Sequence, residues 1–244
     1  MKNLLLFLDY DGTLTPIVKK PHLAKLSKAR QAKLRKISTT PHIRVVVISG
    51  RKLADLKKLV GIPGIFYAGN HGFEISGPKT SLVHPKAKAA KPIIAKIKKE
   101  LTKELKGIKG TLVEDKTLTL SLHYRLVKAA ALPKVKKIFS QVTEPYLKSK
   151  KIRITEVKKV LEVRPNIDWD KGKAVLWFLE KKFKGKRVFP IFIGDDTTDE
   201  DAFIALKDKG STFRVGRSET THAKHIIKDV DQVYHLLEFL PLEF

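Results

Sequence analysis

Short apolar runs alternate with amphipathic stretches in residues 1–83 and again in residues 166–244. A short apolar run bounded by turn residues is typical of a buried strand. The pattern predicts strands at 4–9, 43–49, 65–68, 187–193 and 212–215. Helical spacing predicts helices over about 22–38, 52–60, 170–183, 199–209 and 229–239. Strands that alternate with helices favour an α/β fold with a doubly wound, mostly parallel sheet.

The middle of the chain has a different pattern. From Thr117 to His123 the leucines alternate with polar residues, as in an antiparallel strand with one buried face. The order helix, strand, strand occurs twice, with helices at about 87–105 and 129–147 and strands at about 111–115, 118–125, 152–156 and 159–164. We therefore expect a smaller α+β domain at 84–165, inserted between two halves (1–83 and 166–244) of a discontinuous core.

Carboxylates follow two of the predicted buried strands. Asp9 and Asp11 follow the run Leu4–Leu8, and Asp195, Asp196 and Asp199 follow the run that ends at Gly194. The carboxyl ends of parallel strands form the edge where α/β sheets place ligands, and clustered carboxylates ionise poorly without a cation. Oxygen ligands in a chain without cysteine favour Mg²⁺ over zinc. Acidic residues after strands can instead cap helices, which would account best for Asp199.

Several segments carry a family resemblance. The segments Asp9–Leu14, Val45–Arg51, Lys171–Gly172 and Gly194–Asp199 resemble, in order, the motifs of the haloacid dehalogenase-like phosphatases. Other segments resemble the trehalose-6-phosphate phosphatase branch of that superfamily, namely Thr15–Ile17, Gly69–Glu74, His123–Arg125, Leu161–Pro165 and Asp199–Phe203. The resemblance covers nearly the whole chain, and its strength lies in the order of motifs that are individually weak to moderate.

The resemblance implies a magnesium-dependent phosphatase that works through an aspartyl-phosphate. Asp9 would be the nucleophile and Asp11 the general acid and base, which requires a proton on Asp11 in the first step. Ser49 and Lys171 would contact the phosphoryl group, although Ser49 could instead cap the helix at 52–60 and Lys173 could replace Lys171. The implied Mg²⁺ ligands are Asp9, the backbone carbonyl of Asp11, and Asp195, with Asp196 and Asp199 orienting the bound waters and Lys171.

The resemblance also implies a set of phosphate and substrate contacts. In the core these are Gly12, Gly50, Arg51, His71, Gly72 and Glu200; in the inserted domain they are Glu114, Lys116, Arg125, Lys158 and Glu162. Glu114 and Lys116 are two residues apart in a strand and so share a face. The alternative for the inserted-domain set is exposed cross-strand ion pairs. Trehalose 6-phosphate is the substrate that the resemblance favours. The alternatives are sucrose phosphate, mannosyl-phosphoglycerate or a broad range of phosphate esters, all hydrolysed by the same chemistry.

The chain carries 50 Lys and Arg residues against 25 Asp and Glu, a net charge of +25. Such a charge usually indicates affinity for nucleic acid, anionic membranes or acidic substrates, so a nucleic-acid-binding protein with a vestigial phosphatase fold is the alternative of a different class. The lysines are scattered over every segment and aromatic residues do not alternate with them, which favours solvated helix faces. We therefore expect a sugar phosphate partner and no specific nucleic acid.

The N-terminal apolar run is too short for a signal peptide or a membrane span, because only five apolar residues precede Asp9. The absence of cysteine excludes disulfides and thiolate zinc sites and fits a reducing compartment. We expect a cytoplasmic protein without membrane contact, either a monomer or a weak oligomer.

Overall fold

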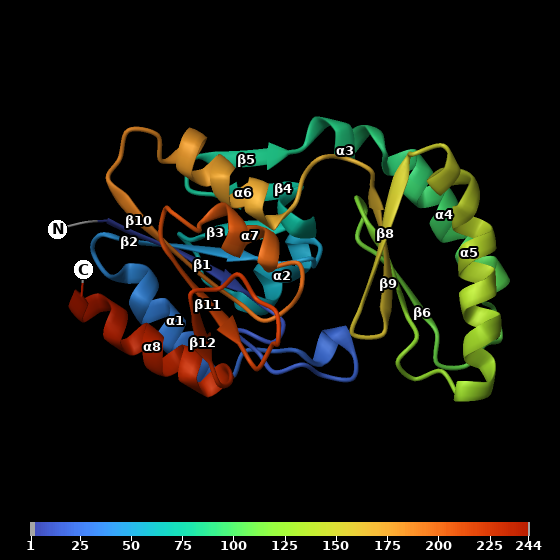
Figure 1. Ribbon diagram of the computed structural model, residues 1–244, viewed down its shortest axis with the longest axis horizontal. Helices are drawn as coiled ribbons and strands as arrows, with labels where there is room; N and C mark the ends of the chain where they lie inside the picture. The colour runs from blue at the N-terminus through green and yellow to red at the C-terminus, as the bar shows by residue number, and fades with distance from the viewer. Residues whose placement is uncertain (1–2, 244) are drawn as a thin grey trace. The chain divides into compact units, whose positions relative to one another are not determined.

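The computed structural model describes residues 3–243 (Figure 1). The chain forms two compact units, which we call the core unit (Met1–Leu82 with Trp169–Phe244) and the inserted unit (Val83–Asp168). The inserted unit thus begins one residue before, and ends three residues after, the bounds 84–165 expected from the sequence.

The core unit contains an eight-stranded sheet in the order β12-β11-β10-β1-β2-β3-β4-β5. All neighbouring strands from β12 to β3 are parallel, and β4 is antiparallel to β3. The strand bounds are β1 Asn3–Asp9, β2 Ile43–Ile48, β3 Phe66–Gly69, β4 Glu74–Gly77, β5 Thr80–Val83, β10 Val188–Gly194, β11 Ser211–Val215 and β12 His225–Ile227. The parallel register ends β1 and β10 at the same edge of the sheet, which brings the acidic segments that follow them together.

Helices cover both faces of this sheet. One core cluster joins α1 (Lys28–Thr39), α2 (Leu53–Val60) and α8 (Val230–Glu243) to Leu4, Leu6 and Leu8 of β1. The other joins α6 (Lys171–Trp177), its π-helical extension Phe178–Lys182 and α7 (Glu200–Ala205) to Leu5 and Phe7. Alternate residues of the central strand β1 therefore pack against helices on opposite faces of the sheet, which confirms the doubly wound α/β fold.

Several predicted element bounds are wrong. The helix expected at 22–38 divides into a 3₁₀ turn, Pro21–Leu23, and α1, because the Ser27 side chain accepts a hydrogen bond from the Arg30 backbone N–H at 3.2 Å and starts the helix there. The helix expected at 199–209 ends at Ala205. β4, β5 and β12 were not expected, since they are short and lack a clear apolar alternation.

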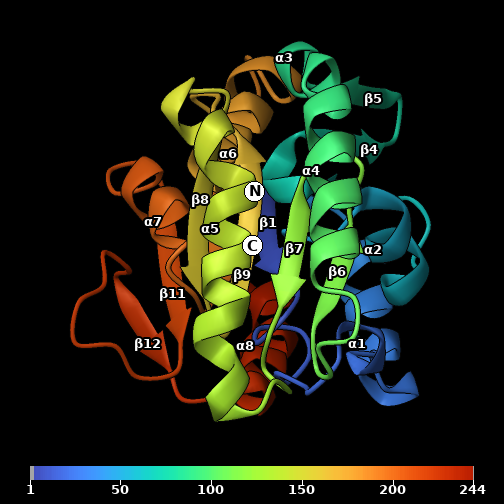
Figure 2. The ribbon, with the colours of Figure 1, turned by 90° about the vertical axis from the view of Figure 1, so that its right-hand side faces the viewer.

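The inserted unit is a four-stranded antiparallel sheet in the order β6-β7-β9-β8. Its bounds are β6 Leu112–Asp115, β7 Leu120–His123, β8 Ile152–Val157, β9 Val160–Pro165, α3 Pro85–Ala89, α4 Lys91–Glu104, a 3₁₀ turn Ala129–Ala131 and α5 Leu132–Lys148. α4 and α5 lie side by side on one face of this sheet (Figure 2), and their residues Ile97 and Phe139 pack on Leu120, Leu122 and Val163. The opposite face carries polar side chains at its centre, such as Ser121 and Glu162.

Among the residues described, no helix combines the length and the apolar character that a membrane crossing requires.

Candidate active site

A buried cluster of charged groups lies at the carboxyl end of β1. The Lys171 ammonium donates hydrogen bonds to Oδ1 of Asp9 and to Oδ1 of Asp199, each at 2.7 Å. All three side chains are buried. Lys171 is the first residue of α6, whose start is capped by Asp170 accepting from the Lys173 backbone N–H at 2.7 Å. The structure therefore brings Lys171, and not the alternative Lys173, to Asp9.

Negative charge exceeds positive charge in this cluster. Burial raises the pKa of Asp9 well above its usual range and raises the pKa of Asp199 to about 7. The nearby carboxylates of Asp195 and Asp196 raise both pKa values further, whereas the Lys171 ammonium lowers them. Burial alone would lower the pKa of Lys171, but the adjacent Asp199 and Asp9 outweigh it and raise that pKa. A further cation would relieve this excess.

Carboxylate oxygens of Asp9, Asp195 and Asp199 lie within 4.8 Å of one another, so this acidic cluster could hold a metal ion. Both oxygens of Asp199 are already engaged, since Oδ2 accepts from the backbone N–H groups of Asp195 and Asp196 at 3.0 Å each. Oδ2 of Asp9 accepts no hydrogen bond within the described part of the chain. An all-oxygen set that includes the Asp9 and Asp195 carboxylates suits a hard cation such as Mg²⁺.

The remaining predicted acid of this loop, Asp196, has a local role. Its Oδ1 accepts from the backbone N–H of Thr198 at 2.8 Å and from the Thr198 hydroxyl at 2.7 Å. These bonds shape the turn between β10 and α7.

Gly12 joins the loop after β1 to the loop after β10. Its φ of +98° favours glycine, and a Cβ placed there would lie 1.9 Å from Oδ2 of Asp195. The Gly12 backbone N–H donates to the Thr15 carbonyl at 2.7 Å and closes the turn. The absence of a side chain thus lets the Asp195 carboxylate pack directly on the turn that carries Asp11.

Asp11 is paired with Arg51. The Arg51 Nε and Nη2 donate to the two oxygens of Asp11 at 2.6 Å each, and Nη2 also donates to the Pro21 carbonyl at 2.9 Å. The guanidinium lies 5.3 Å from the centre of the Tyr10 ring. Both Asp11 oxygens therefore accept a hydrogen bond from Arg51, which fixes the orientation of this carboxyl group.

Ser49 follows β2 and lies in the same turn as Arg51. Its hydroxyl oxygen accepts from the Arg51 backbone N–H at 3.2 Å. The N-cap of α2 is Lys52, so Ser49 does not cap that helix.

His71 is held against this turn by a left-handed segment. Asn70, His71 and Gly72 have φ values of 49°, 56° and 90°. The His71 backbone N–H donates to the Ser49 carbonyl at 2.9 Å, and a Cβ on Gly50 would lie 2.6 Å from His71 Nε2. A left-handed conformation costs a non-glycine residue about 1–2 kcal/mol, so this segment is fixed by its contacts. The structure therefore brings together Ser49, Gly50, Arg51, His71 and Gly72, and their contacts with phosphate or substrate stay a prediction.

Glu200 lies in a network of the core unit. Its Oε1 accepts from Arg214 at 2.7 Å and from the Thr221 hydroxyl at 2.8 Å, and its Oε2 accepts from the His222 backbone N–H at 2.7 Å. Its role as a sugar contact stays a prediction. Arg214, which the sequence interpretation missed, donates to the carbonyls of Asp195 and Asp196 at 3.0 and 3.3 Å. The position of Arg214 near the carboxyl end of the predicted strand 212–215, where ligand sites of α/β sheets lie, could have indicated it.

Three of the five expected residues of the inserted unit, Glu114, Lys116 and Glu162, gather on the sheet face opposite α4 and α5. Across β6, β7, β9 and β8, Glu114, Ser121, Glu162 and Thr155 form one row. Lys116 Nζ donates to Glu162 Oε1 at 2.8 Å, and His123 Nε2 lies 2.6 Å from Glu114 Oε2. His123 was not named as a site residue, although it belongs to the polar half of the alternation at 117–123.

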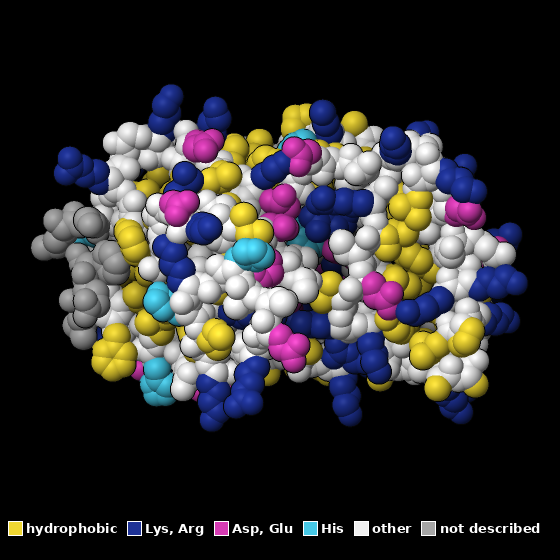
Figure 3. Space-filling view, in the orientation of Figure 1, with side chains coloured by type: hydrophobic (Ala, Val, Ile, Leu, Met, Phe, Trp, Pro, Cys, Tyr) yellow, Lys and Arg dark blue, Asp and Glu magenta, His cyan; other side chains and the backbone are white. Residues whose placement is uncertain are grey.

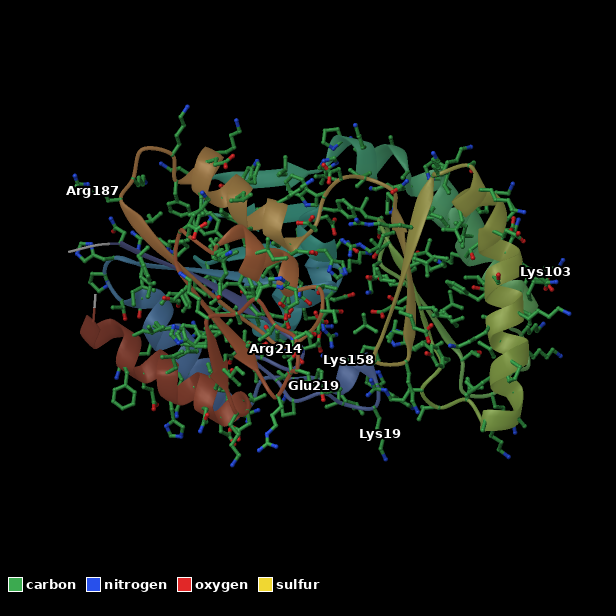
Figure 4. The ribbon with its side chains drawn as sticks, viewed as in Figure 1. Lys19, Lys103, Lys158, Arg187, Arg214 and Glu219 are labelled. Atoms are coloured by element: carbon green, nitrogen blue, oxygen red, sulfur yellow. The ribbon has the colours of Figure 1, made fainter. Side chains whose placement is uncertain are left out.

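Arg125 and Lys158 lie at the β8–β9 hairpin turn. Arg125 Nη2 donates to the Lys158 carbonyl at 2.8 Å. Lys158 and Lys159 both have positive φ, as a two-residue hairpin turn requires, and Lys158 is labelled at this turn in Figure 4.

Known proteins resemble this chain over most of its length. The model of the trehalose-phosphatase family matches residues 7–233. A probable trehalose-phosphate phosphatase D of Arabidopsis thaliana is 35% identical over 253 residues, which cover 98% of this chain and 67% of the plant protein. A trehalose-phosphate phosphatase of Mycobacterium avium (strain 104) is 39% identical over 204 residues, which cover 82% of this chain and 51% of that protein. The chain thus spans about two thirds of the first relative and half of the second.

Solved structures show the same similarity. The C-terminal domain of a C. albicans trehalose-6-phosphate phosphatase has a TM-score of 0.80 at 26% identity, covering 98% of this chain and 92% of that domain. A haloacid dehalogenase-like hydrolase from Bacteroides thetaiotaomicron has a TM-score of 0.66 at 19% identity, covering 97% of this chain and 99% of that chain, and supports the fold alone.

Proposed function

The chain belongs to the trehalose-phosphatase family, and on that premise we propose that it is a magnesium-dependent phosphatase that hydrolyses trehalose 6-phosphate to trehalose and phosphate. The observation that carries the proposal is the buried Asp9 carboxylate at the end of β1, bound by Lys171 and adjacent to Asp195 and Asp199. Phosphoryl transfer depends mainly on positioning and charge neutralisation, and this cluster offers both.

The proposed first step forms an aspartyl-phosphate. A carboxylate oxygen of Asp9 attacks phosphorus, a phosphorus–oxygen bond forms on Asp9, and the bond to the sugar oxygen breaks. Asp11 gives its proton to that sugar oxygen, once it has left Arg51. Lys171 holds Oδ1 of Asp9 at 2.7 Å and so limits rotation of the attacking carboxylate.

In the second step a water molecule attacks the phosphorus of the aspartyl-phosphate, and Asp11 takes a proton from that water. The bond between phosphorus and the Asp9 oxygen breaks, which releases phosphate and restores the Asp9 carboxylate. Mg²⁺ bound by Asp9 and Asp195 would neutralise charge on the transferred phosphoryl group. The Ser49 hydroxyl, in the turn after β2, is the proposed donor to a phosphoryl oxygen.

The polar face of the inserted unit is the proposed sugar-recognition surface. Its Glu114–His123 and Lys116–Glu162 pairs offer both acceptors and donors to hydroxyl groups. A site that hydrogen-bonds a substrate hydroxyl strongly rejects analogues that lack it, because its own polar groups would lose their partners. The names of the plant, mycobacterial and fungal relatives support trehalose 6-phosphate as the sugar phosphate.

The test is phosphate release with Mg²⁺ from trehalose 6-phosphate, sucrose 6-phosphate, mannosyl-phosphoglycerate and p-nitrophenyl phosphate. The control variant is Asp9→Asn, which keeps the shape of the side chain but removes the attacking carboxylate. We expect preference for trehalose 6-phosphate and a loss in Asp9→Asn of at least about a thousandfold. Equal turnover of all four esters would contradict the substrate, and release that survives Asp9→Asn or a chelator would contradict the mechanism.

A further inference from the structure

Arg214 binds the backbone carbonyls of Asp195 and Asp196 in the loop after β10. It lies on β11, in register with Gly194 at the end of β10, and Figure 4 shows it on the core unit. Its Nη2 donates to the Asp195 carbonyl at 3.0 Å and its Nη1 to the Asp196 carbonyl at 3.3 Å. The side chain is 12% exposed, so water does not readily replace these bonds.

Asp199 binds the same two residues through their backbone N–H groups. Its Oδ2 accepts from the N–H groups of Asp195 and Asp196 at 3.0 Å each. The N–H groups of both residues are therefore held by Asp199 at the N-cap of α7, and their C=O groups by Arg214 on β11. This leaves the backbone beneath the Asp195 carboxylate little freedom.

Glu200 fixes Arg214 in turn. Its Oε1 accepts from Arg214 Nη1 at 2.7 Å, and the Thr221 hydroxyl and the His222 backbone N–H bind the same carboxylate. One guanidinium thus bonds two carbonyls and a carboxylate at once. The planar fork of arginine can do this, whereas the single ammonium of lysine cannot match the geometry.

We propose that Arg214, held by Glu200, is a positioning residue that fixes the Asp195 carboxylate for the divalent cation. This inference rests on the proposed function, since that function places the cation at Asp9 and Asp195. Residues that orient metal ligands without touching the metal typically change metal affinity about 10- to 100-fold when they are replaced. Arg214 acts here through the peptide groups that carry the ligand.

The first experiment measures Mg²⁺ affinity directly, by calorimetry on the full chain without substrate. We expect Arg214→Met to weaken Mg²⁺ binding by about 10- to 100-fold, with Arg214→Lys intermediate. The control is Arg217→Met, an exposed arginine three residues further along the chain, which should bind Mg²⁺ like the unmodified protein. Thermal unfolding in chelator identifies any variant that fails to fold, in which case Arg214→Lys carries the test.

Unchanged Mg²⁺ affinity in a folded Arg214 variant would overturn the inference while leaving the proposed function intact. Absence of Mg²⁺ binding in the unmodified protein would overturn both, since no cation would remain for Arg214 to position.

The second experiment separates the role of Glu200 from a sugar contact. If Glu200 acts through Arg214, Glu200→Gln should raise the Mg²⁺ concentration for half-maximal rate equally with trehalose 6-phosphate and with p-nitrophenyl phosphate. A rise in KM for trehalose 6-phosphate alone, with Mg²⁺ dependence unchanged, would overturn this part of the inference and assign Glu200 to the sugar.

Discussion

At the scale of single residues, the central feature is one buried ammonium shared by two buried carboxylates. Lys171 reaches across 162 residues of sequence to Asp9 and across 28 to Asp199. Buried charges are tolerated when they are paired and hydrogen-bonded, and removing one partner leaves the others uncompensated. The proposed mechanism requires the same three groups to be held in fixed places.

Lys171→Met should therefore destabilise the protein strongly as well as inactivate it. We expect the free energy of unfolding to fall by about 3–5 kcal/mol, because Asp9 and Asp199 would be buried without a cation. Denaturant unfolding measures this loss. The matched control Lys173→Met, two residues further along the same helix, should cost less than about 1 kcal/mol; similar losses in the two variants would show that the buried pairing has no special weight.

The stability of the metal-free protein should fall as the pH rises. Burial raises the pKa of Asp199 to about 7 when the chain is folded, against an ordinary value of about 4. Between these values the folded chain binds more protons than the unfolded chain, so the stabilisation present below about pH 4 is lost by about pH 7. Thermal unfolding in chelator between about pH 5 and 8 should show this fall, and added Mg²⁺ should reduce it.

Asp199→Asn should reduce this dependence, although the raised pKa of Asp9 will keep part of it, whereas Asp208→Asn, which removes an exposed carboxyl, should leave it unchanged. If Asp199→Asn keeps the full slope, the titrating group lies elsewhere.

At the scale of elements, two strand ends and two tight turns assemble the site. β1 and β10 pair in parallel from Asn3 and Val188 to Leu8 and Ile193, so their following loops meet. Gly12 then allows the two loops to touch, because a Cβ would lie 1.9 Å from Asp195 Oδ2. Close approach of these turns depends on the lack of a side chain at this position.

Gly12→Ala should damage Mg²⁺ binding through this contact. The matched control is Gly64→Ala, because Gly64 also has positive φ (+81°) but no heavy atom within 4 Å of the position that a Cβ would occupy. Both variants should lose about 1 kcal/mol of stability from the backbone conformation alone. Only Gly12→Ala should displace Asp195 and weaken Mg²⁺ affinity, as measured by calorimetry; equal Mg²⁺ affinity in the two variants would refute the role of the contact.

At the scale of the whole molecule, charge is distributed broadly. On the face shown in Figure 3, Lys and Arg side chains are dispersed, with Asp and Glu side chains among them. The inserted unit holds 22 of the 50 basic residues but only 8 of the 25 acidic ones, so it carries more than half of the net charge of +25. A field of this sign attracts phosphate esters without selecting among them.

Added salt should therefore slow capture of the substrate more than its turnover. Between about 50 and 300 mM salt we expect kcat/KM for a phosphate ester to fall several-fold, because screening shortens the reach of the positive field. The value of kcat at saturating substrate should change little. Steady-state kinetics at fixed Mg²⁺ concentration measures this effect. A kcat/KM that does not change with salt would show that the surface charge does not accelerate binding of the substrate.

The sequence alone determined the fold class and the edge of the sheet that carries the candidate site. Buried strands such as β1 and β10 were evident because their apolar runs are local and uninterrupted, and Asp9 and Asp195 follow those runs directly. The antiparallel strand around Leu120 was evident for the same local reason, since alternation along a strand reflects its two faces. Short strands such as β12 were not predicted, because three residues are too few for an alternation of apolar and polar positions to distinguish a strand from a loop.

Only the tertiary structure decided which of these side chains meet. Whether Lys171 or Lys173 reaches Asp9 depends on where Asp170 caps α6. The Arg51–Asp11 and Arg214–Glu200 pairs join residues 40 and 14 positions apart along the chain. Hydrogen bonds act over about 3 Å and depend on direction, so they follow from the packed arrangement of elements and leave no periodic trace in the sequence. The pattern of residues therefore located the edge of the sheet that carries the candidate site, and packing determined the partner of each charged group.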